Sequence, residues 1–147
     1  MSVAKILIEK DKLFTMSGAN TVFNAVTGMD ERNLGVALIT DESNKIVGVF
    51  SERDLMRRIV AVGKDPQTTK LKDVMTSPLV TIPVGTLPSA ALEVLQKFKI
   101  RHLPVRADDS EEIIGIVSIK DLLSYMVTVV TTLNKKLKTE LDQYSFL

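Results

Sequence analysis

The chain has 147 residues, of which 45% are apolar and 25% charged, and its formal net charge is +1. This length fits one ordinary domain or two small domains that share a core, and so balanced a charge favours neither nucleic acid nor a membrane surface as a partner. The absence of Cys excludes a disulfide framework, a thiolate metal site and a cysteine nucleophile, and a single His, His102, disfavours zinc. Early charges in the first residues and the lack of any membrane-length apolar run predict a protein of the cytoplasm.

The first half of the chain predicts a strand, a helix, two strands and a second helix. The spacing of Val22, Val26 and Met29 is helical, and Thr21 stands where a hydroxyl would cap the first amide groups. A polar hairpin turn separates the next two strands, and Ser51 is placed to cap the closing helix. The expected strands are 13–16, 36–40 and 46–50, the turn is 41–45, and the helices begin at 21 and 51.

The second half predicts the same order of elements again. Its first strand lies between Pro78 and Pro83, which suits the edge of a sheet, and Thr86 and Ser118 precede the two helices as expected caps. The expected strands are 79–82, 103–106 and 113–117, with a polar turn at 108–112. We therefore divide the chain into a first repeat at 1–62, a linker at 63–70, a second repeat at 71–128 and a C-terminal helical extension at 129–147.

Two seven-residue segments establish that the halves are copies of one unit. Residues 48–54 and 115–121 both read Gly, apolar, apolar, Ser, any residue, basic, Asp, and 115 − 48, 118 − 51 and 121 − 54 all give 67. Each copy has only about sixty residues, too few to bury a large core alone, so the copies should pack through their sheets about a pseudo-two-fold axis. The predicted fold class is α+β (α/β in some classifications), with two β-α-β-β-α repeats and a C-terminal helix.

Beyond Leu122 the sequence predicts one long helix with an apolar stripe. Apolar residues recur at spacings of three and four, at Leu122, Met126, Val130, Leu133, Leu137 and Leu141. The basic residues Lys135, Lys136 and Lys138 fall on other faces and are expected to be solvated. Because a long helix needs a surface to lie against, the stripe predicts a packing seam, either within the module or across a homodimer.

With these motifs, the chain resembles a pair of cystathionine-β-synthase (CBS) domains over nearly its whole length. In that family each repeat ends in Gly-apolar-apolar-Ser/Thr-x-x-Asp, present here twice, and the family's Leu-Pro-Val strand stands at residues 103–105. The segments 49–54 and 100–104 are similar to stand-alone CBS-pair proteins of bacteria and archaea. The resemblance implies a regulatory homodimer, not an enzyme, that binds an adenine nucleotide (AMP, ATP or NAD) between its repeats and signals to an unidentified protein.

The repeated motif also has its own physical reason to bind a nucleotide. A carboxylate in the first turn of a helix, such as Asp54 or Asp121, can accept two hydrogen bonds from a ribose diol, each contributing about 1.5–3 kcal/mol. Ser51 and Ser118 begin those helices, where free amide groups and the helix dipole favour an anion. The neighbouring basic residue would neutralise a phosphate.

The resemblance implies two sites, each built from both repeats. The first would combine Asp54, Thr15 and Leu34 with Arg101, His102, Ser118 and Lys120, and the second would combine Asp121, Thr81 and Ile100 with Leu34, Gly35, Ser51 and Arg53. Asp54 and Asp121 are the expected ribose ligands. The expected phosphate ligands are Arg101, His102, Ser118, Lys120, Ser51 and Arg53. The expected base contacts are Thr15, Leu34, Gly35, Val36, Thr81 and Ile100.

The two sites are not equivalent. Since Arg101 and His102 correspond to Leu34 and Gly35, we expect the Asp54 site to hold phosphate more tightly. No residue is expected to be catalytic or to bind a metal.

Three other functions stay open at this stage. A ligand-independent interaction scaffold would keep the Ser–Asp motif for helix capping alone. A hydrolase using Asp54 or Asp121 would have no Cys, one His, no phosphate loop and no acidic cluster to work with. A DNA-binding protein would need a basic face. Arg57 and Arg58 are expected to be solvated, although one of them could reach the outer phosphates of a dinucleotide.

Overall fold

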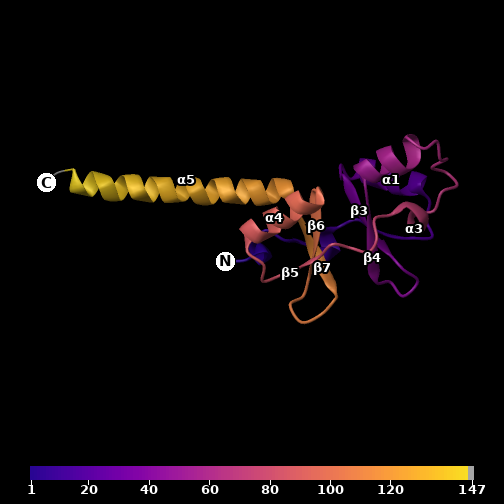
Figure 1. The fold of residues 1–147 in the computed structure, drawn as a ribbon, viewed down its shortest axis with the longest axis horizontal. Helices are drawn as coiled ribbons and strands as arrows, with labels where there is room; N and C mark the ends of the chain where they lie inside the picture. Colours follow the sequence, from indigo (N-terminus) through magenta and orange to yellow (C-terminus); the bar gives the residue numbers. More distant parts are fainter. Residues whose placement is uncertain (146–147) are drawn as a thin grey trace.

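Figure 1 shows a computed structural model in which residues 1–145 are described, with a two-part body from which one long helix projects. The strands are β1 (Ile8–Glu9), β2 (Thr15–Ser17), β3 (Val36–Thr40), β4 (Ile46–Ser51), β5 (Ile82–Pro83), β6 (His102–Arg106) and β7 (Ile113–Ser118). The helices are α1 (Val22–Glu31), α2 (Glu52–Asp54), α3 (Leu71–Val74), α4 (Pro88–Phe98) and α5 (Ile119–Tyr144). Helix α2 continues as a π-helical segment, η3 (Leu55–Val60), and two 3-10 turns, η1 (Val3–Lys5) and η2 (Lys10–Lys12), lie near the N-terminus.

The two sheets confirm the predicted repeat of β-α-β-β-α units in an α+β fold. The first sheet has the order β2-β3-β4, and the second has the order β1-β7-β6-β5. In each repeat a short leading strand runs parallel to the middle strand, and the following hairpin is antiparallel. Both hairpins change register at the same place, between Ile39 and Thr40 in the first and between Val105 and Arg106 in the second. The two copies therefore share their irregularities as well as their topology.

Each repeat places its leading segment against the sheet of the other repeat, which the sequence did not predict. Strand β1 pairs antiparallel with β7, with Ile8 opposite Ile116. At the corresponding place in the first repeat, Thr76 forms a two-hydrogen-bond bridge with Val49 of β4, at 2.8 and 3.2 Å. The leading segment of each repeat, which we call its clasp (Ile8–Glu9 in the first repeat and Thr76 in the second), thus pairs with the sheet of the other repeat.

The glycine that opens each repeated motif is required by this clasp. A Cβ added at Gly115 would collide with the carbonyl oxygen of Ile8, and one added at Gly48 would collide with the side chain of Met75. Both positions are therefore occupied by the one residue that lets another backbone segment lie this close to the strand.

Three apolar clusters hold the body together, one in each repeat and one between them. Phe50 and Ile39 are fully buried in the first repeat, and Leu103 and Leu122 in the second. The third cluster is formed by both sheets and contains Val36, Leu38, Ile46, Ile113 and Ile116. The predicted packing of the repeats through their sheets is thus confirmed. All five residues are aliphatic, as expected where the inner faces of two sheets pack against each other.

The leading strands begin later than predicted. The structure has Thr15–Ser17 and Ile82–Pro83 in place of 13–16 and 79–82. The reason is that Leu13 and Leu79 pack against the cluster between the repeats, so their apolar character serves that packing and not strand pairing.

Three of the four predicted hydroxyl caps are present. The side chains of Thr21, Ser51 and Ser118 accept hydrogen bonds from the amides of Asn24, Asp54 and Asp121. The prediction for Thr86 is wrong, because Leu87 is the N-cap of α4 and has no side-chain cap, while Pro88 occupies the first turn. Proline lacks an amide proton and so reduces the number of donors that a cap must satisfy.

Helix α5 has 26 residues and leaves the body after its first turns (Figure 1). Leu122 is fully buried in the second repeat, whereas Val130, Leu133, Leu137 and Leu141 are each at least 55% exposed. The predicted stripe therefore divides into a buried start and an exposed continuation, and its continuation does not pack within the described chain. No helix within residues 1–145 is both long and apolar enough to cross a membrane.

Candidate functional site

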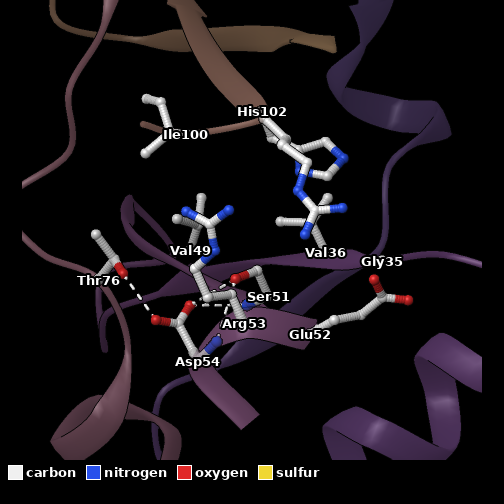
Figure 2. A pocket seen from close by; sticks show the side chains of 11 residues that line it. Gly35, Val36, Val49, Ser51, Glu52, Arg53, Asp54, Thr76, Ile100 and His102 are labelled. Atoms are coloured by element: carbon white, nitrogen blue, oxygen red, sulfur yellow. Dashed lines mark hydrogen bonds between the residues drawn. The ribbon is translucent and has the colours of Figure 1, made fainter. Parts of the chain in front are cut away.

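A pocket lies between the two repeats at the start of α2, and Figure 2 shows its side chains. Its first wall comes from the first repeat and the adjoining segment before β5, and its second wall comes from the end of the α4–β6 connection. The lining residues are Gly35, Val36, Val49, Ser51, Glu52, Arg53, Asp54, Thr76, Ile100, Arg101 and His102. The pocket thus combines an apolar slot, a carboxylate and a group of basic side chains from both repeats.

Asp54 is the acid of this pocket and is held in place by its own helix cap. Its Oδ2 accepts hydrogen bonds from the Ser51 amide at 2.9 Å and the Ser51 hydroxyl at 3.0 Å, and its Oδ1 accepts one from the Thr76 hydroxyl at 3.1 Å. The residue is 8% exposed. The reciprocal bonds between Ser51 and Asp54 form a capping box, so the same two residues start the helix and orient the carboxylate.

Arg58 extends the support of Asp54, although its side chain is 46% exposed and so is solvated as expected. Its Nε lies 3.5 Å from Oδ1 of Asp54, and its Nη1 donates to the carbonyls of Val74 and Met75 at 3.0 and 2.7 Å. The guanidinium therefore fastens the leading segment of the second repeat to the acid of the first. Arg57 is also exposed, as expected, and has no hydrogen bond to Asp54.

The opposite wall brings Arg101 and His102 from the second repeat. Burial lowers the pKa of His102 below its ordinary value of 6.5, and the positive charge of Arg101 lowers it further, while Glu52 and Asp121 act in the opposite sense. The ring of His102 is therefore neutral near pH 7 and can donate from one nitrogen and accept at the other. Arg101 is exposed and supplies the fixed charge of this wall.

Arg53 lines the pocket and connects its two walls. Its Nη1 donates to the carbonyl of Lys99 at 2.5 Å. Lys99 ends α4 with a left-handed backbone, at φ 53°, and this turn directs its carbonyl away from the helix. The contact fixes one end of the Arg53 guanidinium and leaves its other N–H groups able to bind an anion.

The structure brings eight of the predicted site residues together. Gly35, Val36, Ser51, Arg53, Asp54, Ile100, Arg101 and His102 all line the one pocket. Thr15, Leu34, Thr81, Ser118, Lys120 and Asp121 are not among its lining residues. Thr15 lines a different groove, together with Leu13 and Glu112. The pocket therefore combines the ribose acid of the first predicted site with apolar and basic residues assigned to both.

The second motif acid, Asp121, lies in a separate hollow at the start of α5. The hydroxyl of Ser118 donates to its Oδ2 at 2.6 Å. The hollow is lined by Lys5, Ile6, Leu7, Ile8, Ser124, Tyr125 and Thr128 in addition to Asp121. Ile8 pairs with β7 at the position where Thr76 pairs with β4. Because Ile8 has no hydroxyl group, it cannot donate a hydrogen bond to Asp121 as Thr76 does to Asp54.

The pocket residues that sequence reasoning missed are Thr76, Val49 and Glu52. Thr76 belongs to the leading segment of the second repeat but lines the pocket at Asp54 of the first. No local sequence pattern records that each leading segment pairs with the other repeat. Glu52 approaches Gly35, where an added Cβ would lie 3.3 Å from the carboxyl group. The position after the motif serine can be any residue in the repeated motif, so the sequence did not predict that Glu52 would line the pocket.

A family comparison agrees with the repeated fold. The model of the CBS domain matches the chain twice, at residues 4–61 and 71–128. The chain therefore belongs to the CBS-domain family. It is a tandem pair of such domains, and such pairs are known as regulatory modules.

Individual relatives support the same class. An uncharacterised protein of Methanopyrus kandleri, MK0525, is 29% identical over 131 residues, which is 89% of this chain and 66% of that protein. The inosine-5'-monophosphate dehydrogenase of Halalkalibacterium halodurans is 38% identical over 110 residues, 74% of this chain but 21% of the enzyme. A CBS-domain protein of unknown function from Thermoplasma acidophilum, TA0289, has a TM-score of 0.79 at 27% identity, covering 85% of this chain and 68% of the other.

The chain thus spans between a fifth and two thirds of the length of these curated relatives. Its similarity to the dehydrogenase covers a minor part of that enzyme, and stand-alone CBS-domain proteins are generally regulatory.

Proposed function

We propose that this chain is a regulatory module that binds an adenine nucleotide in the pocket between its repeats, with no catalytic step of its own. The observation that carries the proposal is the meeting of Asp54, from one repeat, with Arg101 and His102, from the other. A carboxylate at one end, and the Arg101 cation with the hydrogen-bonding ring of His102 at the other, suit a ligand with a diol at one end and a phosphate at the other.

The pocket offers a place for each part of such a ligand. Val36, Val49 and Ile100 form an apolar slot for a flat base. Asp54 has about four acceptor positions on its two oxygens; Ser51 and Thr76 use three of them and Arg58 lies 3.5 Å from Oδ1, so the ribose hydroxyls would replace some of these donors. AMP, ATP and NAD share the adenosine part that these groups would contact.

Because the ligand would touch both repeats, binding would favour one relative orientation of the two. A partner that contacts both repeats would then respond to nucleotide concentration through that orientation. We propose that the module is a homodimer of the cytoplasm and acts on a protein target that the chain does not itself contain.

A second candidate, a ligand-independent scaffold, is favoured by one observation. Both oxygens of Asp54 already accept hydrogen bonds within the protein, so the motif has a structural role without any ligand. In that case dimerisation and partner binding would be unaffected by nucleotide.

Thermal unfolding with AMP, ATP, NAD and S-adenosylmethionine in turn separates the two candidates, with GMP as control. A ligand at a hundred times its dissociation constant stabilises the fold by about 2.7 kcal/mol, which raises the melting midpoint measurably. We expect a rise with at least one adenine nucleotide and none with GMP. No rise with any adenine compound would overturn the proposal in favour of the scaffold.

A further inference from the structure

The exposed part of α5 carries a face of six apolar residues and one amide that we call the α5 seam. Its members are Leu123, Val127, Val130, Asn134, Leu137, Leu141 and Tyr144, and their spacings alternate strictly between four and three residues. The six apolar members are between 47% and 71% exposed. Leu122, which is buried in the second repeat, lies on a different face of the helix, so the body does not cover the seam.

This alternation is the heptad pattern of a coiled coil. With Val127, Asn134 and Leu141 at position a, the d positions are Leu123, Val130, Leu137 and Tyr144. We propose that a second copy of this chain covers the α5 seam and forms a parallel, two-stranded, in-register coiled coil with it. The proposal deepens the proposed homodimer by naming its interface and does not depend on nucleotide binding.

Asn134 is the reason for naming a second copy as the partner. It is the one polar member of the seam, and it lies in the middle of it. An amide has both donors and an acceptor, so two Asn134 side chains at the same level can bond each other across the interface. A single Asn at an a position specifies the register and oligomer state of a parallel pair, at a cost in stability.

An antiparallel pair would lose this match. In that arrangement a positions face d positions, and full overlap of the seam would place Asn134 opposite Val130 or Leu137. Each amide would then be buried without a partner, which costs free energy. The parallel arrangement is therefore the one that satisfies the polar residue.

Area and charge agree with this pairing. Closing the seam would remove on the order of 1,500 Å² from water over both helices, within the range of about 1,200–2,000 Å² typical of specific interfaces. The pairs that would flank the seam between residues 123 and 145 are Met126 with Thr131, Leu133 with Lys138, and Glu140 with Ser145. None of these pairs has like charges.

Disulfide trapping tests the seam, since the chain has no Cys of its own. In the parallel pair the two copies of position 137 lie within reach of a disulfide, so Leu137→Cys should form a covalent dimer nearly completely under mild oxidation. The matched control, Lys135→Cys, lies at an outer b position and should remain largely uncrosslinked. Equal trapping of the 135 and 137 variants would overturn the proposal.

A third variant, Leu141→Cys, tests the direction of the pair. The two copies of position 141 also meet in the parallel pair, so this variant should trap as completely as Leu137→Cys. In an antiparallel pair with full overlap, the two copies would lie about 20 Å apart along the helix axis, beyond the reach of a disulfide. Trapping at position 137 without trapping at position 141 would therefore contradict the parallel arrangement.

Analytical ultracentrifugation of the wild type and of Leu137→Asp separates this proposal from the homodimer itself. We expect a wild-type dimer and a dissociation constant weakened on the order of a hundredfold in the variant, because each helix would bury an unpaired carboxylate. A variant dimer as tight as the wild type would show association through the body, which overturns the seam and leaves the homodimer standing. A wild-type monomer at micromolar concentration would overturn both.

Discussion

The two motif acids of this protein belong to the same sequence motif but have different surroundings. Asp54 accepts hydrogen bonds from two groups of Ser51 and from Thr76, and Arg58 lies 3.5 Å away. Asp121 accepts a hydrogen bond from the Ser118 hydroxyl and lies in a separate hollow. In both repeats the motif places an acid at a capped helix start, and residues of the other repeat determine which groups surround that acid.

The difference comes from three substitutions between the repeats. The first acid faces the basic pair Arg101 and His102, whereas the corresponding positions for the second acid are Leu34 and Gly35. The clasp over the first motif supplies Thr76, and the clasp over the second supplies Ile8. We therefore expect nucleotide to bind to the first site more tightly, and the following changes are ordered by the size of their expected effect.

Replacing each acid in turn tests the comparison most strongly. Asp54→Ala should weaken AMP binding on the order of a hundredfold, because two charge-assisted bonds to the ribose would be lost. Asp121→Ala should leave the tight site within about threefold of wild type, since it lies in the other hollow. Isothermal titration calorimetry measures both. Equal losses in the two variants would show that the sites are not distinct.

The two motif glycines should also differ, in stability. Gly115→Ala places a Cβ against the backbone carbonyl of Ile8, whereas Gly48→Ala meets the flexible end of Met75. We expect Gly115→Ala to lower the free energy of unfolding by about 2–3 kcal/mol and Gly48→Ala by about 1 kcal/mol. Urea unfolding gives both values. A larger loss in Gly48→Ala would mean that the clasp on the first repeat is the more rigid one.

Several of these features could be predicted from the sequence, and others could not. The motif period of 67 and the capping positions of Ser51 and Ser118 predicted the repeats, their packing and the location of Asp54, because capping and periodicity are local. Strand β1 and the role of Thr76 depend on pairing between distant segments, which no local pattern records. The spacing in α5 predicted an apolar face but not that the body would leave it exposed.

Arg101 should contribute to phosphate binding and not to adenosine binding. Arg101→Ala removes the exposed cation of the second wall, so AMP affinity should fall about tenfold, as expected for one charge-assisted bond. Adenosine, which has no phosphate, should bind to the variant and the wild type equally. A matched loss for adenosine and AMP in calorimetry would place Arg101 at the base or ribose and contradict the proposed orientation.

The smallest expected effect is a pH dependence due to His102. Its pKa is lowered in the folded protein by burial and by Arg101, so below about pH 6.5 the unfolded chain takes up this proton more readily than the folded one. Stability should therefore fall as the pH drops from about 7 towards about 5.5, and His102→Gln should remove that part of the fall. Urea unfolding across this range provides the test, and an identical pH profile in the variant would exclude His102 as the source.

A crystal structure of the protein grown with saturating AMP tests the central claim most directly. The account predicts the ribose at Asp54, the base between Val36, Val49 and Ile100, and the phosphate at Arg101 and His102. Nucleotide bound only beside Asp121, or a pocket without nucleotide at a concentration that raises the melting midpoint, would contradict it.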